Sequence, residues 1–198
     1  MNSIIATHSH IDHIGSLSRF RQEYGTKIIA YEPDAQAIET GARVGAETYE
    51  VGYQPCPVDI HLEKAERCLR FGKYVLKIIH IPGHTKDSIA IYTDVASKRI
   101  LFGQDVNGSY EAIWGGKPNQ AITSLQKLME LKADILCEGH FGIYPPDAEV
   151  NKYIDDCLHQ LQQRTRGLHE RFLQLYHSRL YPTLLSSNYS TYLVNGKV

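Results

Sequence analysis

Near its start the chain packs four potential metal ligands into six positions: His8, His10, Asp12 and His13. They directly follow Ser3 to Thr7, a short β-branched run that predicts a buried strand. Residues two apart on an extended chain point the same way, so His8 and His10 can share one metal ion. Asp12 and His13 begin the next helix and point elsewhere, which suits a second ion. Crowded imidazoles repel one another once protonated, and a divalent cation removes that problem because neutral imidazole and carboxylate are its usual ligands.

Three further candidates follow predicted strands in the same way. His84 comes after Ile-Pro-Gly, Asp105 after Leu-Phe-Gly-Gln, and His140 after Cys-Glu-Gly. A strand end followed by a glycine-containing turn is where a fold exposes a side chain to a shared cleft. Each of the three alone is more typical of an ordinary loop residue than of a metal ligand. Together with the first cluster they make seven potential ligands, enough for two metal ions with positions left open for water.

The remaining pattern mixes strands with helices. Apolar spacing predicts helices over 14–24, 33–41 and 120–131, and a C-terminal helical region over 148–180 that is interrupted or kinked near Gly167 and stopped by Pro182. Strands are predicted at 27–31, on both sides of Gly72-Lys73, at 89–93, at 99–102 and at 135–137, whereas 42–58 is irregular. This mixture predicts a layered α/β or α+β fold.

The composition bounds the class of protein. With 198 residues, 42% hydrophobic, we expect one domain over 1–198, with a motif core at 3–145, helices at 147–180 and a tail strand at 186–198. A net charge of −1 gives no field for nucleic acid or a membrane surface, and no apolar run reaches the length of a membrane span. The four cysteines form no C-x-x-C pair, and we find no signal peptide. A cytoplasmic protein with reduced thiols is therefore expected.

Four motifs along the chain resemble, in order, those of the metallo-β-lactamase fold superfamily: Thr7-His-Ser-His-Ile-Asp-His-Ile-Gly15, Pro82-Gly-His-Thr85, Gly103-Gln-Asp105 and Glu138-Gly-His140. The hydrolase branch that includes glyoxalase II is the most similar. The resemblance implies an αββα sandwich with the metal site at one edge of its two sheets. It assigns His8, His10 and His84 to a first metal ion and Asp12, His13 and His140 to a second, with Asp105 bridging the two.

The resemblance also implies a chemistry. Two divalent ions, zinc first and iron or manganese as alternatives, would activate a bridging hydroxide, and Asp12 would orient it and accept its proton. The expected reaction is hydrolysis of an ester, thioester, lactone or phosphodiester in a small-molecule substrate. Tyr110 and Trp114, on a glycine-rich loop after Asp105, either line the substrate pocket or pack as ordinary aromatics. An iron-dependent oxidoreductase or dioxygenase, and a truncated non-enzymatic metal-binding module, stay open as alternatives.

The chain departs from the family pattern at two places. Lys86-Asp87 stands where many relatives have Pro-Gly, and no basic glutathione-binding pattern is found, so thioester specificity is not indicated. Relatives normally begin with several strands before the first motif, whereas the tail Tyr189 to Val198 resembles such an opening strand. The order is therefore either permuted or the product of truncation or rearrangement. We expect Tyr189 to Val194 to pair with the strand at 4–7 in the same or a neighbouring chain, giving a homo-oligomer, with strand exchange as one form of it.

Overall fold

The protein is described here by a computed structural model that covers residues 2–63, 67–110, 112 and 115–180. The chain divides into two compact units, Met1–His159 and Gln160–Val198. The first unit contains both sheets and every candidate ligand. Helix α5 (Asp147–Leu180) begins in this unit, and its turns from Gln160 onward are the described part of the second. Trp114 and the predicted tail strand lie outside the described residues.

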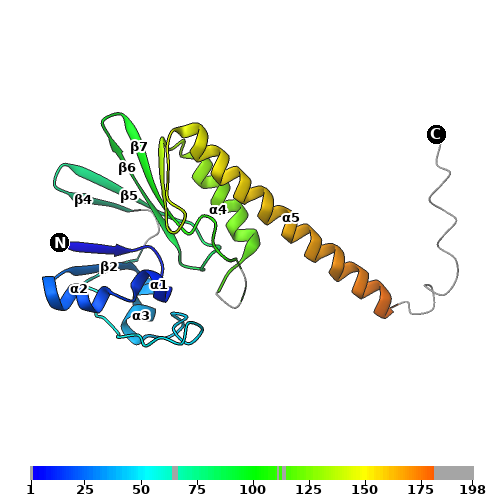
Figure 1. Ribbon diagram of the computed structural model, residues 1–198, viewed down its shortest axis with the longest axis horizontal. Helices are drawn as coiled ribbons and strands as arrows, with labels where there is room; N and C mark the ends of the chain where they lie inside the picture. The colour runs from blue at the N-terminus through cyan, green and yellow to red at the C-terminus, as the bar shows by residue number, and fades with distance from the viewer. Residues whose placement is uncertain (1, 64–66, 111, 113–114, 181–198) are drawn as a thin grey trace. The chain divides into compact units, whose positions relative to one another are not determined.

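The first sheet is parallel and three-stranded, in the order β1 (Ser3–Ala6), β2 (Lys27–Tyr31) and β3 (Ile60–Leu62). Parallel neighbours need crossover connections, and here these contain α1 (Ile11–Ile14), α2 (Leu17–Tyr24) and α3 (Glu32–Thr40). Figure 1 shows these helices gathered beside the blue strands. The apolar side chains of helices and strands meet in one buried cluster, which includes Ala6, Ile14, Leu17, Ile28, Ala30 and Ile38.

The second sheet is six-stranded, and its order follows the sequence: β4 (Arg67–Phe71), β5 (Tyr74–His80), β6 (Ile89–Val95), β7 (Lys98–Gln104), β8 (Ile135–Glu138) and β9 (Ile143–Tyr144). Strands β6 and β7 form a hairpin closed by Ala96 and Ser97, both at positive φ, which matches the right-handed twist of the strands. Strands β7 and β8 are parallel, and α4 (Pro118–Glu130) connects them.

A second buried cluster joins the two sheets. Ile29 and Leu62 of the first sheet pack against Ile78, Ile89 and Ile91 of the second. This apolar layer fixes one sheet on the other, so the loops that leave their strands are held at a constant separation. Two sheets in contact, with helices packed on them, confirm the predicted fold class.

Several predicted elements differ from those in the structure. Strands β3 and β9 were not predicted, because a run of two or three residues carries little periodicity and becomes a strand only by pairing with a neighbour. The helix predicted over 14–24 is two helices, since the chain turns between Ile14 and Leu17. The C-terminal helix is not interrupted at Gly167, because one glycine costs a helix only about 1 kcal/mol.

Gly83 is the glycine whose replacement should disturb the fold most. Its φ is +149°, and a Cβ there would lie 2.4 Å from Cα of Ala121 in α4. We expect Gly83→Ala to lower the free energy of unfolding by roughly 2–5 kcal/mol, because the backbone strain and the clash act together. Urea unfolding measures the loss. Gly72→Ala is the matched control, since Gly72 has φ +59° but nothing within 4 Å, so it should cost only about 1 kcal/mol. Equal losses of unfolding free energy in Gly83→Ala and Gly72→Ala would show that the contact with Ala121 is not destabilising.

Candidate metal centre

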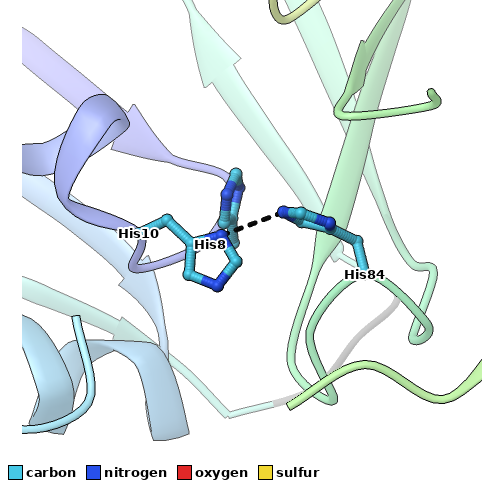
Figure 2. A group of neighbouring side chains, drawn as sticks. All are labelled: His8, His10 and His84. Carbon is cyan, nitrogen blue, oxygen red and sulfur yellow. Dashed lines mark hydrogen bonds between the residues drawn. The ribbon is translucent and has the colours of Figure 1, made fainter. Parts of the chain in front are cut away.

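Three imidazoles from two sheets meet in the first group. His8 and His10 follow β1, whereas His84 comes from the loop between β5 and β6, and Figure 2 shows the three rings turned toward one another. Their ligand atoms lie within 4.8 Å of one another, and Nε2 of His84 is 3.0 Å from Nδ1 of His10. All three side chains are buried. The first predicted ligand set therefore lies together, deep in the molecule.

The second predicted set, Asp12, His13 and His140, also converges, with ligand atoms within 4.8 Å of one another. Nε2 of His13 lies 3.1 Å from Nε2 of His140, and that of His140 lies 3.4 Å from Oδ2 of Asp12. This group is more open than the first: the side chains of Asp12 and His140 are 36% and 41% exposed. Water from solvent can therefore reach this side of the centre.

Asp105 lies between the two groups. Its Oδ2 is 3.2 Å from Nε2 of His84 and 3.3 Å from Nε2 of His140, and its Oδ1 is 3.1 Å from Nε2 of His13. One carboxylate thus contacts both sets, as a bridging ligand would. All seven residues singled out in the sequence lie around one point of the first unit.

The protonation states suit a cation. Burial, reinforced by the charge of His13, holds the pKa of His8 well below its usual value, so this imidazole is neutral and able to coordinate. Both ring nitrogens of His8 are buried and have no hydrogen-bond partner among the described residues. Burial alone would raise the pKa of Asp105, but hydrogen bonds from His13 and His84 outweigh it and hold the pKa well below its usual range. Buried unpaired nitrogens beside an ionised carboxylate fit a divalent metal.

Hydrogen bonds fix the loops that carry these ligands. Nδ1 of His84 lies 2.7 Å from the carbonyl oxygen of Ser109, which leaves its Nε2 to face the centre. Nε2 of His80 lies 3.0 Å from the carbonyl oxygen of Lys86 and ties down the same loop. Asp34, in the first turn of α3, is a buried residue for which no role was predicted. Burial raises the pKa of Asp34 to about 7, and hydrogen bonding to Ser9, the residue between His8 and His10, opposes that rise.

Two glycines make room for the ligands. A Cβ at position 108 would lie 2.5 Å from Nδ1 of His84, and one at position 139 would lie 2.6 Å from Oδ1 of Asp105. Both contacts are shorter than atoms tolerate, so at these two places the backbone approaches the ligands in a way that only glycine permits.

A cavity of about 370 Å³ opens beside the first group. His10 and Thr85 form part of its wall, and helix α3, the α3–β3 loop and the loop after His84 supply its charged residues. Among the described residues these are Asp34, Arg43, Glu47, Lys86 and Asp87. The volume is in the range of small-molecule sites, but the lining carries more charge than is usual for them.

The predicted aromatic lining is placed only in part. The Tyr110 hydroxyl donates to the carbonyl oxygen of Val106 in its own loop, and its ring meets that of His84 edge-on, with centroids 6.4 Å apart. It borders a void of about 10 Å³ beside His84 and Asp105, too small for a substrate. Whether Tyr110 contacts a substrate stays a prediction.

Glu138 is a second residue that sequence analysis left without a role. Its carboxylate accepts three backbone N–H groups in two ligand loops. Its place directly before Gly139-His140 was the only available signal.

Comparison with known proteins agrees with this geometry. The family model of the metallo-beta-lactamase superfamily matches residues 2–140. The chain belongs to this superfamily. The match covers every candidate ligand, from His8 to His140, and the superfamily is generally hydrolytic.

Two curated relatives illustrate the range of sequence similarity. An uncharacterized protein of Aquifex aeolicus (strain VF5) is 29% identical over 146 residues, which are 70% of this chain and 67% of that one. A protein of Cereibacter sphaeroides named hydroxyacylglutathione hydrolase is 26% identical over 143 residues, which are 71% of this chain and 48% of the relative. The chain thus spans about half the length of that hydrolase.

Solved structures share the fold. One is a class B3 di-zinc metallo-beta-lactamase from an Alaskan soil metagenome, with a TM-score of 0.66 and 23% identity, covering 84% of this chain and 72% of that one. Among the described residues, no helix combines the length and apolar character needed to cross a membrane.

Proposed function

We propose that this chain is a metal-dependent hydrolase with a dinuclear centre held by His8, His10 and His84 on one side and by Asp12, His13 and His140 on the other, with Asp105 between them. The observation that carries the proposal is the convergence of two ligand groups on one carboxylate. Membership of a generally hydrolytic superfamily supports it. Zinc is the first metal to be tested, because a structural neighbour is named a di-zinc enzyme.

When bound, two such ions would supply Lewis-acid activation of water and of the substrate's carbonyl or phosphoryl oxygen. The remaining work falls to the side chains. Asp12 is the exposed carboxylate of the second group, so it can accept the proton of an incoming water and orient that water toward the substrate. Buried His8 would serve as a neutral ligand, and the cavity that His10 helps to line would keep the substrate next to the first group.

The cavity beside His10 is the proposed substrate site. It is the large cavity that shares a wall with the first group, and its charged lining suits a polar substrate better than a long acyl chain. Relatives named hydroxyacylglutathione hydrolase make a glutathione thioester the first substrate to try, although the sequence lacks the basic pattern expected for it.

A hydrolysis panel tests the proposal. Esters, thioesters, lactones and phosphodiesters would be offered to the purified protein before and after removal of metal by a chelator, followed by readdition of zinc, manganese or iron. We expect cleavage of at least one class, its loss with chelator and its recovery with metal. Elemental analysis of protein purified without added metal identifies the ion. Activity that is insensitive to the chelator, or no cleavage at any metal loading, would contradict the proposed metal-dependent hydrolase.

The same proposal predicts where an ion will lie. Zinc bound to the first group should sit about 2.0–2.1 Å from one nitrogen each of His8, His10 and His84. Anomalous scattering from a zinc-soaked crystal measures this directly. A strong peak elsewhere, with none among these rings after soaking, would show that the three imidazoles do not form a metal site.

A further inference from the structure

The carboxylate of Glu138, at the end of β8, lies between two loops that carry proposed ligands. Its Oε1 accepts the backbone N–H of Asn107 at 3.2 Å, and its Oε2 accepts those of His140 and Phe141 at 2.7 and 2.8 Å. Hydrogen bonds to an ionised acceptor are about twice as strong as neutral ones, and here both oxygens are in use. Glu138 therefore links the loop that follows Asp105 to the loop that contains His140.

Each loop places one ligand of the centre. Asn107 lies two residues after Asp105, and Phe141 directly follows His140. The backbone supports the same arrangement, because Gly139 donates to the carbonyl oxygen of Gln104 at 3.0 Å. The result is a separation of 3.3 Å between Oδ2 of Asp105 and Nε2 of His140. Without the carboxylate, three N–H groups lose their acceptor and the loops can part.

We propose that Glu138 is a positioning residue for the second metal ion: its carboxylate sets the distance between Asp105 and His140. The inference rests on the proposed dinuclear centre but concerns one half of it. The three amides that Glu138 holds belong to the loops of Asp105 and His140, so the first ion should depend on Glu138 much less than the second.

Metal titration of three proteins tests the proposal. Zinc and cobalt binding would be followed by calorimetry and by the cobalt absorption spectrum in the unaltered chain, in Glu138→Gln and in Glu138→Ala. We expect the second equivalent to bind about 10–100-fold more weakly in Glu138→Ala, with a far smaller change for the first. The affinity of Glu138→Gln for the second equivalent should lie between those of the unaltered chain and Glu138→Ala. An amide keeps one acceptor oxygen, but its NH₂ group replaces the other oxygen and cannot accept a backbone N–H.

Controls separate positioning from general damage. Glu130, exposed at the end of α4, is the matched glutamate, and Glu130→Ala should leave both equivalents unaltered. A selective loss of the second equivalent supports the proposal. Equal weakening of both ions in the Glu138 variants, or binding like that of the unaltered chain, overturns it. If Glu138→Ala fails to fold, Glu138→Gln decides alone by the same criterion.

Amide hydrogen exchange gives a readout that needs no metal. In the unaltered protein the N–H groups of Asn107, His140 and Phe141 should be protected, and Glu138→Gln should raise the exchange of some of them while distant strands stay protected. Metal stoichiometry and amide exchange together distinguish failure of the proposed dinuclear function from failure of the proposed role of Glu138. A chain that binds a single ion contradicts the dinuclear function, whereas unaltered exchange at all three amides contradicts the role of Glu138 whatever the metal content.

Discussion

Replacing Asp12 by alanine is expected to lower kcat/KM by about 10³-fold on any substrate the protein hydrolyses, with most of the loss in kcat. Asp12 belongs to the second candidate ligand group and is its exposed carboxylate, so the variant should lose a proposed ligand and the proposed proton acceptor together. Steady-state kinetics with saturating zinc measures the loss, and metal analysis of the same samples shows how much of it follows from an empty second position.

Lys86→Ala is the comparison. Lys86 lines the cavity with a side chain that is 54% exposed, and its ammonium group lies 3.7 Å from Asp87. It shapes a turn and the rim of the cavity, so its removal should affect KM more than kcat and by less than about tenfold. Equal small losses in Asp12→Ala and Lys86→Ala, with metal retained in both, would show that the proton acceptor lies elsewhere.

Removing the metal should destabilise the whole first unit. The ligands come from both sheets, since His8 to His13 follow β1 whereas His84, Asp105 and His140 follow strands of the second sheet. An ion bound between them would tie the two sheets together in the folded state only. At a free metal concentration 1,000 times the dissociation constant, one site contributes about 4 kcal/mol. We therefore expect a chelator to lower Tm by about 10 °C.

Asp105→Ala should reproduce the effect without a chelator, because Asp105 contacts both ligand groups. Differential scanning calorimetry in excess zinc measures it, and Asp155→Ala, on the exposed face of α5, is the matched control. If Tm of the unaltered chain does not respond to zinc or chelator, or if both alanine variants shift alike, the ion does not join the sheets.

Local sequence could predict the candidate ligands because each carries a local signal. His84, Asp105 and His140 follow strands through glycine-containing turns, and chains that end their strands at one edge bring such turns together. Asp34 carries no such signal, and Glu138 carries only its place before Gly139-His140. Their roles depend on which backbone N–H groups the tertiary fold places beside them, such as that of Asn107 for Glu138.

The fold shows the same division. The periodicity of α4 and the alternation of β6 and β7 were sufficient to predict them, whereas β3 and β9 exist only through pairing with neighbours. The predicted pairing of Tyr189 to Val194 with β1 stays a prediction. Deleting residues 186–198 tests it, since loss of metal or aggregation is expected and a soluble, metal-binding truncation would contradict it.

Because Gly108 and Gly139 approach His84 and Asp105 closely, few substitutions are tolerated on that side of the centre. At these two positions even a methyl group collides with His84 or Asp105, so substitutions there should disrupt the site and not create a new specificity. Arg43 and Glu47 line the cavity beside His10 and are exposed on a loop outside any helix or strand, so substitutions there need not disturb the candidate ligands. Directed evolution toward new substrates should therefore accumulate its successful substitutions on the α3–β3 loop and leave Gly108 and Gly139 unchanged.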